Sequence, residues 1–390
     1  MLNRIYHVVR RALVPGFFLG LFWLMLHCAS AQAQAVVTTN FNLRVMAANT
    51  TSGNLQRYDP PGLRIFQGLK PDVVAVQEFN YVSTNGQGTN TPLAMREMID
   101  AAFGTNFYFY REPGSYSIPN GIISRWPIVA SNSWEDVDTG VNDRGFAWVR
   151  IDLPGTNDLY VVSVHLKAQS GSTNPARRAA QAAQLTSLIQ SNFPSNAWII
   201  VAGDCNAENR NEACLTTFKT FLSDSPVPDD GNLNGTPNPN TNEPRAKPYD
   251  YVLPSFTLDT NRVATVIGSR TFANGLVFDS RVYSPLVEVA PVVVGDSGVT
   301  GMQHMAVVKD FRISYTVTNQ VTTPPPPLLT LVSASVFRWA GPSNLTYRVL
   351  GSGSLSNFTQ AGTSSSLSTN YFFTNSAPLT NQRFFRVVWP

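Results

Sequence analysis

The chain has 390 residues, of which 43% are hydrophobic and 14% charged, a composition typical of folded proteins and not of disordered ones. This length exceeds that of one ordinary domain and indicates one large domain with a smaller companion. The formal net charge of +3 at pH 7 excludes binding to nucleic acid through a strongly basic overall charge, although it allows a local basic patch.

The first 35 residues are predicted to be a secretory signal peptide. Three arginines precede an apolar run from Ala12 to Leu26, and the sequence ASAQAQA that follows offers small-x-small cleavage sites. A membrane anchor is the less favoured alternative, because the run is short for a span. We therefore expect a secreted or periplasmic protein. Cleavage would leave 25 Lys and Arg residues against 25 Asp and Glu, and two histidines, His165 and His304.

From residue 36 to 317, short β-rich runs alternate with amphipathic stretches. In chain order we expect strand 43–47, helix 63–69, strand 73–76, helix 93–103, strands 107–110, 121–124, 146–151 and 159–164, helix 176–189 capped by Asn174, and strand 198–203. This pattern favours two packed mixed β-sheets flanked by helices. The Pro/Gly/Asn-rich stretch 226–248 is predicted to be a surface loop, and its place between two strands allows a position on the substrate side.

The C-terminal part differs in composition. Residues 318–327 (TNQVTTPPPP) are predicted to be a stiff, extended linker. Residues 328–390 are rich in Ser, Thr and Asn, hold four arginines and no acidic residue, and contain short β runs. We expect a small all-β, sandwich-like accessory module that binds a surface polymer or anchors the protein, with a spacer as the alternative. Residues 36–317 keep 21 of the basic residues and all 25 acidic ones.

Polar side chains stand at the ends of several apolar strands. The clearest example is Gly203-Asp204-Cys205-Asn206, which follows the buried run 198–202. A turn that uses Asp and Asn for local hydrogen bonds would explain this example alone. The same pattern recurs along the chain, however, and includes both histidines of the mature protein. Such a set favours a metal-assisted hydrolytic site; its members are Asn49, Glu78, His165, Asp204, Asn206, Asp250 and His304.

Two cysteines, Cys205 and Cys214, remain in the mature chain. A disulfide is compatible with export, and a pair of buried free thiols is equally compatible with a strand end in the core. The sequence leaves both alternatives open.

The ordered motifs resemble the endonuclease/exonuclease/phosphatase superfamily, which includes deoxyribonuclease I, apurinic endonucleases, bacterial sphingomyelinases and inositol-polyphosphate 5-phosphatases. The resemblance spans roughly residues 41 to 315. The matching motifs are Asn49 after the first strand, Gln77-Glu78 after the second, Asn120 to Ile128 (NGIISRWPI), Arg144 to Ala147, Ser163 to Leu166, Gly203 to Asn206, and Asp250 in the run Asp-Tyr-Val-Leu.

The resemblance implies a fold and a cofactor. The fold is an α/β architecture, a four-layer α/β/β/α sandwich of two mixed β-sheets over residues 36–317, and the cofactor is a divalent cation, Mg²⁺ or Mn²⁺. Glu78 would be the principal metal ligand, with Asn49 close by, because hard oxygen donors suit a hard cation.

The resemblance also implies roles for the other residues. Asp204 would orient and deprotonate the attacking water, and Asn206 would hold the phosphate or the water. His304, paired with Asp250, would act on the phosphate side, and His165 would bond to a non-bridging oxygen or assist the leaving group. Substrate-contacting positions of nuclease members match Tyr116, Asn120 and Arg144.

One departure concerns the metal. The family usually has Ser-Asp-His before its last strand, whereas this chain has Met302-Gln303-His304. A glutamine carbonyl brings no charge, so we expect a weaker affinity for Mg²⁺. Asp296, on the preceding loop, is the candidate to compensate.

Together these features predict an exported, monomeric, metal-dependent phosphodiester hydrolase, an extracellular nuclease acting on DNA or RNA. A sphingomyelinase-like lipid phosphodiesterase is one alternative and would need an exposed apolar hairpin at the membrane surface. A sugar or inositol phosphatase and a catalytically degenerate binding protein are the others. The near-zero charge of the mature chain does not favour nucleic acid, because phosphate contacts dominate such affinity.

Overall fold

The computed structural model describes residues 34–53, 56–136, 142–233, 235–320, 329–333, 335–341, 343–353, 357–376 and 384–388. The predicted signal peptide up to residue 33 and most of the predicted linker lie outside these described residues. The chain divides into two compact units, one formed by Thr38–Val317 and one that contains the residues from Thr318 onward.

The first β-sheet of the larger unit has the strand order β10-β14-β1-β2-β4-β3, with β13 pairing separately with β14. Its strands are β1 (Gln34–Ala48), β2 (Val73–Val76), β3 (Tyr108–Arg111), β4 (Gly121–Ser124), β10 (Arg262–Val263), β13 (Leu276–Phe278) and β14 (Ala306–Gln320). β2 is parallel to β1 and antiparallel to β4. All four residues of β2 are buried, as expected for a continuous apolar run in a strand with both faces covered.

The second sheet has the simple order β5-β6-β7-β8-β9. Its strands are β5 (Ile128–Trp134), β6 (Phe146–Ile151), β7 (Leu159–His165), β8 (Trp198–Asp204) and β9 (Asp250–Pro254). β7 and β8 are parallel, and the other neighbours are antiparallel. The sheet is therefore mixed, like the first.

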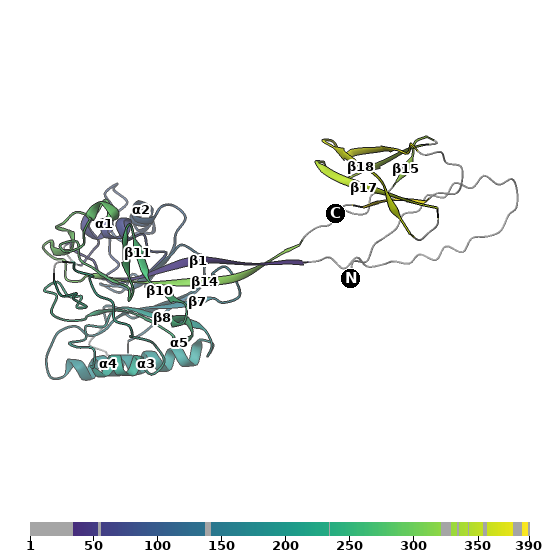
Figure 1. Ribbon diagram of the computed structural model, residues 1–390. Coiled ribbons are helices and arrows are strands. Elements are labelled where there is room, and N and C mark those ends of the chain that lie inside the picture. The colour runs from purple at the N-terminus through teal and green to yellow at the C-terminus, as the bar shows by residue number, and fades with distance from the viewer. Residues whose placement is uncertain are drawn as a thin grey trace. The chain divides into compact units, whose positions relative to one another are not determined.

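Helices cover the outer faces of both sheets (Figure 1). α1 (Pro60–Leu69) and α2 (Pro92–Phe103) pack with the first sheet in one core, and α3 (Asn174–Asn192) and α4 (Ala213–Phe218) pack with the second in another. A third core, with Val45, Val161 and Ile200 among its residues, lies between the sheets. The four-layer α/β/β/α sandwich predicted from the sequence is confirmed.

The C-terminal unit is all β in its described part. Two three-stranded sheets have the orders β15-β16-β19 and β18-β17-β20. Their strands are β15 (Thr330–Leu331), β16 (Val336–Ala340), β17 (Leu345–Ser352), β18 (Thr359–Ser366), β19 (Asn370–Thr374) and β20 (Phe384–Val388). The rings of Trp339, Tyr347 and Tyr371 pack together in their shared core. The predicted all-β module is confirmed.

Several local predictions differ from the structure. The N-cap of α3 is Thr173, and Asn174 is instead the first helical residue. β5 was not predicted, nor were the short helix α5 (Phe256–Asp259) and the β11–β12 pair (Thr265–Ile267 and Arg270–Phe272). Cys205 and Cys214 are both buried and free, which decides between the two alternatives for the cysteines. Among the described residues, no helix combines the length and the apolar character that crossing a membrane requires.

Candidate active site

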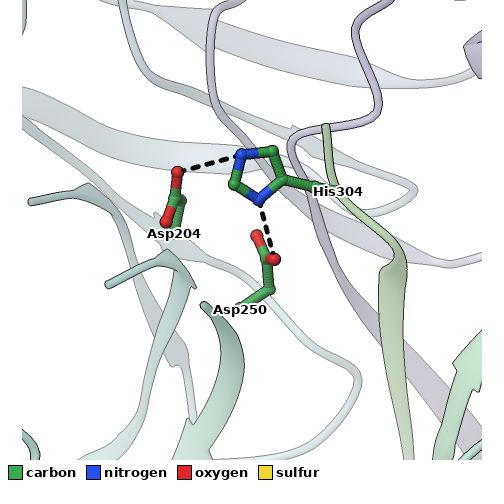
Figure 2. A group of neighbouring side chains, drawn as sticks. All are labelled: Asp204, Asp250 and His304. Atoms are coloured by element: carbon green, nitrogen blue, oxygen red, sulfur yellow. Dashed lines mark hydrogen bonds and ion pairs between the residues drawn. The ribbon is translucent and has the colours of Figure 1, made fainter. Parts of the chain in front are cut away.

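Three of the predicted catalytic residues lie side by side across the second sheet. His165 ends β7, Asp204 ends β8 and Asp250 begins β9. The strand register places His165 opposite Asp204, and Asp204 opposite Asp250. His304 precedes β14 in the other sheet and reaches between the two aspartates (Figure 2). The fourth residue of the cluster therefore comes from a different layer of the sandwich.

The four side chains form a connected chain of polar contacts. His304 Nδ1 lies 2.9 Å from Asp250 Oδ2, and His304 Nε2 lies 3.4 Å from Asp204 Oδ2. His165 Nε2 approaches the same Asp204 oxygen at 3.3 Å. All four residues are buried. Asp204 thus lies between two imidazoles, one of which is also paired with a second carboxylate.

Burial and charge separate the protonation states of the two histidines. For His304, burial alone would lower the pKa, but the carboxylates of Asp250 and Asp204 raise it to about 10. Burial, together with the charges of Arg144 and His304, holds the pKa of His165 well below its usual range. Burial also raises the pKa of Asp204 to about 7, against the opposing effect of His304. At neutral pH, His304 is a cationic hydrogen-bond donor and His165 is neutral.

The turn after β8 fixes the Asp204 carboxylate. The Asn206 backbone N–H donates to Asp204 Oδ1 at 2.8 Å, and Asn206 Nδ2 donates to the Leu166 carbonyl at 3.1 Å. Asn206 has a φ of 50°, a left-handed conformation that asparagine tolerates better than most residues. At Gly203, φ is 133° and an added Cβ would lie 2.3 Å from the Val164 carbonyl oxygen, so glycine is required there.

Asn49 and Glu78, the predicted metal ligands, form a second corner of the site next to Asp204. They follow the ends of β1 and β2, which are adjacent parallel strands. Asn49 Nδ2 donates to Glu78 Oε1 at 3.3 Å and to Asp204 Oδ2 at 3.2 Å. Glu78 also accepts hydrogen bonds from Thr51 Oγ1 and, at 2.7 Å, from Gln56 Nε2. Asn49 therefore connects Glu78 to the chain of polar contacts formed by His165, Asp204, His304 and Asp250.

The donor set of this corner fits a hard divalent cation. Glu78, Asp204 and Asp250 are three carboxylates with at most 3% of their surface exposed. Within the described part of the chain, no lysine or arginine forms an ion pair with any of them, and His304 supplies one positive charge. Buried carboxylates without enough positive charge are costly. A cation held by Glu78 and Asn49 would balance this charge, and oxygen ligands suit Mg²⁺.

Asp204, Asp250 and His304 also lie close enough to surround an ion, since one ligand atom from each falls within 4.8 Å of the others. Both nitrogens of His304, however, already face carboxylate oxygens. Mg²⁺ prefers oxygen ligands to imidazole nitrogen. We therefore interpret these three residues as a hydrogen-bonded chain, and Glu78 and Asn49 stay the predicted cation ligands.

The predicted substrate-contacting residues are placed differently from one another. Tyr116 is half-buried and so presents part of its surface to solvent. Asn120 is fully buried and donates through Nδ2 to a backbone carbonyl at 2.7 Å. Arg144 is also buried and donates to the carbonyls of His165, at 2.8 Å, and of the following residue. In this structure Arg144 orients the end of β7, and contact of Asn120 or Arg144 with a substrate stays a prediction.

Gln303, which replaces the usual aspartate, is exposed, and its backbone carbonyl accepts a hydrogen bond from Glu243 at 2.7 Å. Asp296 does not replace the missing charge as the sequence hypothesis required. Its carboxylate pairs with Arg64 of α1 at 2.5 Å and accepts from the Val293 backbone N–H at 2.9 Å. The structure therefore corrects this part of the hypothesis, because Asp296 is engaged in a structural ion pair.

Sequence reasoning missed three residues that support the site. Thr51 and Gln56 hydrogen-bond to Glu78, and Thr241 Oγ1 accepts from the Asp250 backbone N–H at 2.8 Å. All three lie in loops, and neither periodicity nor a motif marks them. Only the folded structure brings them to their partners.

A family model described as "Endonuclease/Exonuclease/phosphatase family" matches residues 41–297. No curated protein matches the sequence. The solved structures with similar folds include an endonuclease/exonuclease/phosphatase from Beutenbergia cavernae, with 15% sequence identity and a TM-score of 0.46, covering 89% of this chain and 96% of that one.

Two further similar structures have other printed descriptions. The human Nocturnin catalytic domain with bound sulfate anion has 16% identity and a TM-score of 0.44, with 73% of this chain and 98% of that one covered. Beta toxin from Staphylococcus aureus has 15% identity and a TM-score of 0.42, with 68% and 99% covered. At these values the assignment rests on the family model.

Proposed function

Because the chain belongs to the endonuclease/exonuclease/phosphatase family, whose members hydrolyse phosphodiesters and phosphomonoesters, we propose that it is a divalent-metal-dependent phosphodiesterase acting on nucleic acid. The observation that carries this proposal is the buried chain His165–Asp204–His304–Asp250 beside Glu78 and Asn49. It combines a carboxylate base, a cationic donor and a metal corner within one site.

Asp204 is the proposed general base. Burial raises the pKa of its carboxyl to about 7, which is near the optimum for a base that works at neutral pH. Its Oδ1 is held by the Asn206 backbone N–H, while Oδ2 faces both imidazoles. In this arrangement Asp204 takes the proton of a water that attacks the phosphorus.

His304 is the proposed donor to the phosphate. The two flanking carboxylates keep it protonated. Its Nε2–H faces Asp204 Oδ2 at 3.4 Å in this structure and would turn to a non-bridging oxygen as negative charge develops there. Asp250 orients the ring through Nδ1 at 2.9 Å. His165 stays neutral. Its ring would offer one N–H to a phosphate or leaving-group oxygen in place of the contact with Asp204 Oδ2 at 3.3 Å.

Glu78 and Asn49 would hold the cation, for which we propose Mg²⁺ or Mn²⁺. When bound, such an ion supplies Lewis-acid stabilisation of a phosphate oxygen. The hydrogen bonds from Thr51 and Gln56 to Glu78 orient the carboxylate for this task. We also propose export of the protein through the predicted signal peptide, and binding of a surface polymer by the C-terminal unit.

Hydrolysis of defined substrates tests the proposal. Plasmid DNA, RNA, sphingomyelin vesicles and a chromogenic phosphodiester are each incubated with Mg²⁺, Mn²⁺ or EDTA. We expect cleavage of DNA or RNA that EDTA and Asp204→Asn both abolish. Turnover of the lipid alone would overturn the nuclease assignment. Folded protein that turns over none of the substrates would instead support a binding protein that has lost its chemistry.

One observation favours a lipid substrate as the second candidate. The loop 286–296, which precedes His304 in the sequence, exposes three valines: Val287 at 79%, Val293 at 50% and Val294 at 61%. Exposed apolar side chains that gather on one surface are a feature of membrane-binding sites, and these three valines lie close together in the sequence. Co-sedimentation with sphingomyelin vesicles distinguishes the candidates, because replacing all three valines by serine should abolish it only if the loop binds lipid.

A further inference from the structure

The segment 238–248, predicted to be part of a surface loop, lies against both Asp250 and His304. Thr241, which is fully buried, accepts the Asp250 backbone N–H through Oγ1 at 2.8 Å. The Thr241 carbonyl accepts the Met305 backbone N–H at 2.6 Å. Its neighbour Asn242 forms an antiparallel β-bridge with His304. Residues 241 and 242 thus contact both members of the Asp–His pair.

This connection matters because the two partners belong to different sheets. Asp250 begins β9 of the second sheet, and His304 precedes β14 of the first. Their hydrogen bond spans 54 positions of sequence. The 238–248 segment ties the two layers together at the point where the side chains meet, so its conformation sets the distance between them.

Arg245 holds the 238–248 segment in this conformation. Its Nε donates to the Asn240 carbonyl at 2.7 Å, and Nη2 donates to the Asn238 carbonyl at 2.8 Å. The same guanidinium pairs with Asp230 at 3.1 Å and with Asp279 at 2.8 Å. The Arg245 side chain is 11% exposed, and both carboxylates are buried. Four acceptors in different directions require the forked donor set of arginine.

The backbone supports the same interpretation. Arg245 has a φ of 58°, a left-handed conformation that is uncommon for a residue with a long side chain. Such a conformation persists when surrounding contacts fix it. The Asn238 and Asn240 side chains supply two of these contacts by donating back to the Arg245 carbonyl, at 2.9 and 3.2 Å.

We infer that Arg245 is a positioning residue for the reaction: it fixes Thr241 and Asn242, and through them the meeting of Asp250 with His304. In this role it acts through these residues and is not itself a catalytic group. The kinetic consequence rests on the proposed function, whereas the effect on the Asp250–His304 hydrogen bond does not.

The test compares Arg245→Met and Arg245→Lys with a control, Arg262→Met. Arg262 pairs with Asp259 three positions away. Among the described residues, no hydrogen bond or ion pair joins its side chain to the 238–248 segment. The first readout is the NMR signal of the His304 ring N–H bonded to Asp250, in the full-length labelled protein. The second is kcat and KM for the best phosphodiester substrate.

We expect Arg245→Met to lose or shift the ring N–H signal. It should lower kcat by about 10- to 100-fold, since misplacement of a catalytic group by about 1 Å has effects of this size. KM should change by less than about threefold. Arg245→Lys should recover part of kcat, and Arg262→Met should resemble the wild type. A folded Arg245→Met with the wild-type signal and kcat would overturn the inference, even if its melting temperature were lower.

Two further outcomes remain decisive. If the wild type cleaves no phosphodiester, the proposed function fails, and the ring N–H signal of the variants still decides the role of Arg245. If Arg245→Met does not fold, Asp230→Asn removes the negative charge of one of its partners at nearly constant volume. A changed ring N–H signal in Asp230→Asn then supports the inference, and an unchanged signal contradicts it.

Discussion

Replacing Lys309 by methionine should stabilise the protein at neutral pH. Lys309 lies in β14 with 1% of its surface exposed, and the described residues offer its ammonium no ion-pair partner. It lines a cavity of about 10 Å³, room for about one water. Burial lowers the pKa of Lys309 from 10.5 to about 8, and the carboxylates of Asp224 and Asp259 offset only part of this effect. Holding the ammonium charged in the folded state is therefore costly.

The size of the effect follows from the pKa difference. A lysine pKa that falls from 10.5 in the unfolded chain to about 8 in the folded protein corresponds to about 3 kcal/mol of unfolding free energy. Because the folded state loses this proton first, the wild type gains stability as pH rises from about 8 to 10.5. Below pH 8 the methionine variant should exceed the wild type by up to about 3 kcal/mol, and the difference should vanish above pH 10.5.

Urea unfolding at several pH values measures this difference. The transition of the unit Thr38–Val317 is identified by its larger denaturant dependence, since it exposes more surface. Lys219→Met is the matched control, because Lys219 is near the same Asp224 but is 32% exposed; its effect should stay within about 0.5 kcal/mol. Equal stabilities of wild type and Lys309→Met at pH 7, or a gap that does not close at high pH, would refute the reasoning.

Three other substitutions have defined outcomes. Asp250→Asn removes a carboxylate that keeps His304 protonated against burial, so activity at pH 7 should fall at least about 100-fold. This deficit, relative to the wild type at the same pH, should narrow as pH is lowered and His304 regains its proton, and a deficit that does not vary with pH would contradict this role. Gln303→Asp should lower the Mg²⁺ concentration for half-maximal activity by about tenfold, or ~1.4 kcal/mol, and an unchanged requirement would remove Gln303 from the metal hypothesis. Arg178→Met should lower the free energy of unfolding in urea by about 3–5 kcal/mol, because it leaves the buried Glu212 carboxylate without its partner. The double variant with Glu212→Leu should recover most of the lost stability. Failure to recover it would show that the ion pair is not the cause.

The sequence alone predicted the strands whose own residues favour a strand. β2, β4 and β6 were predicted at their observed bounds, because each is a short run of apolar, mostly β-branched or aromatic residues. β5 escaped prediction because its sequence, IVASNSW, has little strand propensity and only one partly covered face. Its pairing with β6 overrides that weak local preference.

The sequence predicted which residues belong to the candidate site, and the structure shows which of them lie together; their roles stay predictions. Strand ends identified Glu78, His165 and Asp204, since polar residues directly after apolar runs are visible in the sequence. The fold decided that His304 meets Asp250 and Asp204, that Arg144 orients β7, and that Asp296 belongs to an ion pair elsewhere.

The sequence by itself determined which residue types stand at which strand ends, and the motif order pointed to the family that the family model confirmed. Tertiary structure alone decided the charge balance of the site and the support it receives from Arg245, whose carboxylate partners lie 15 and 34 positions away. The physical reason is the range of the interactions. Propensity and capping act within a few residues, whereas burial, pKa values and cross-sheet hydrogen bonds depend on how the two sheets pack.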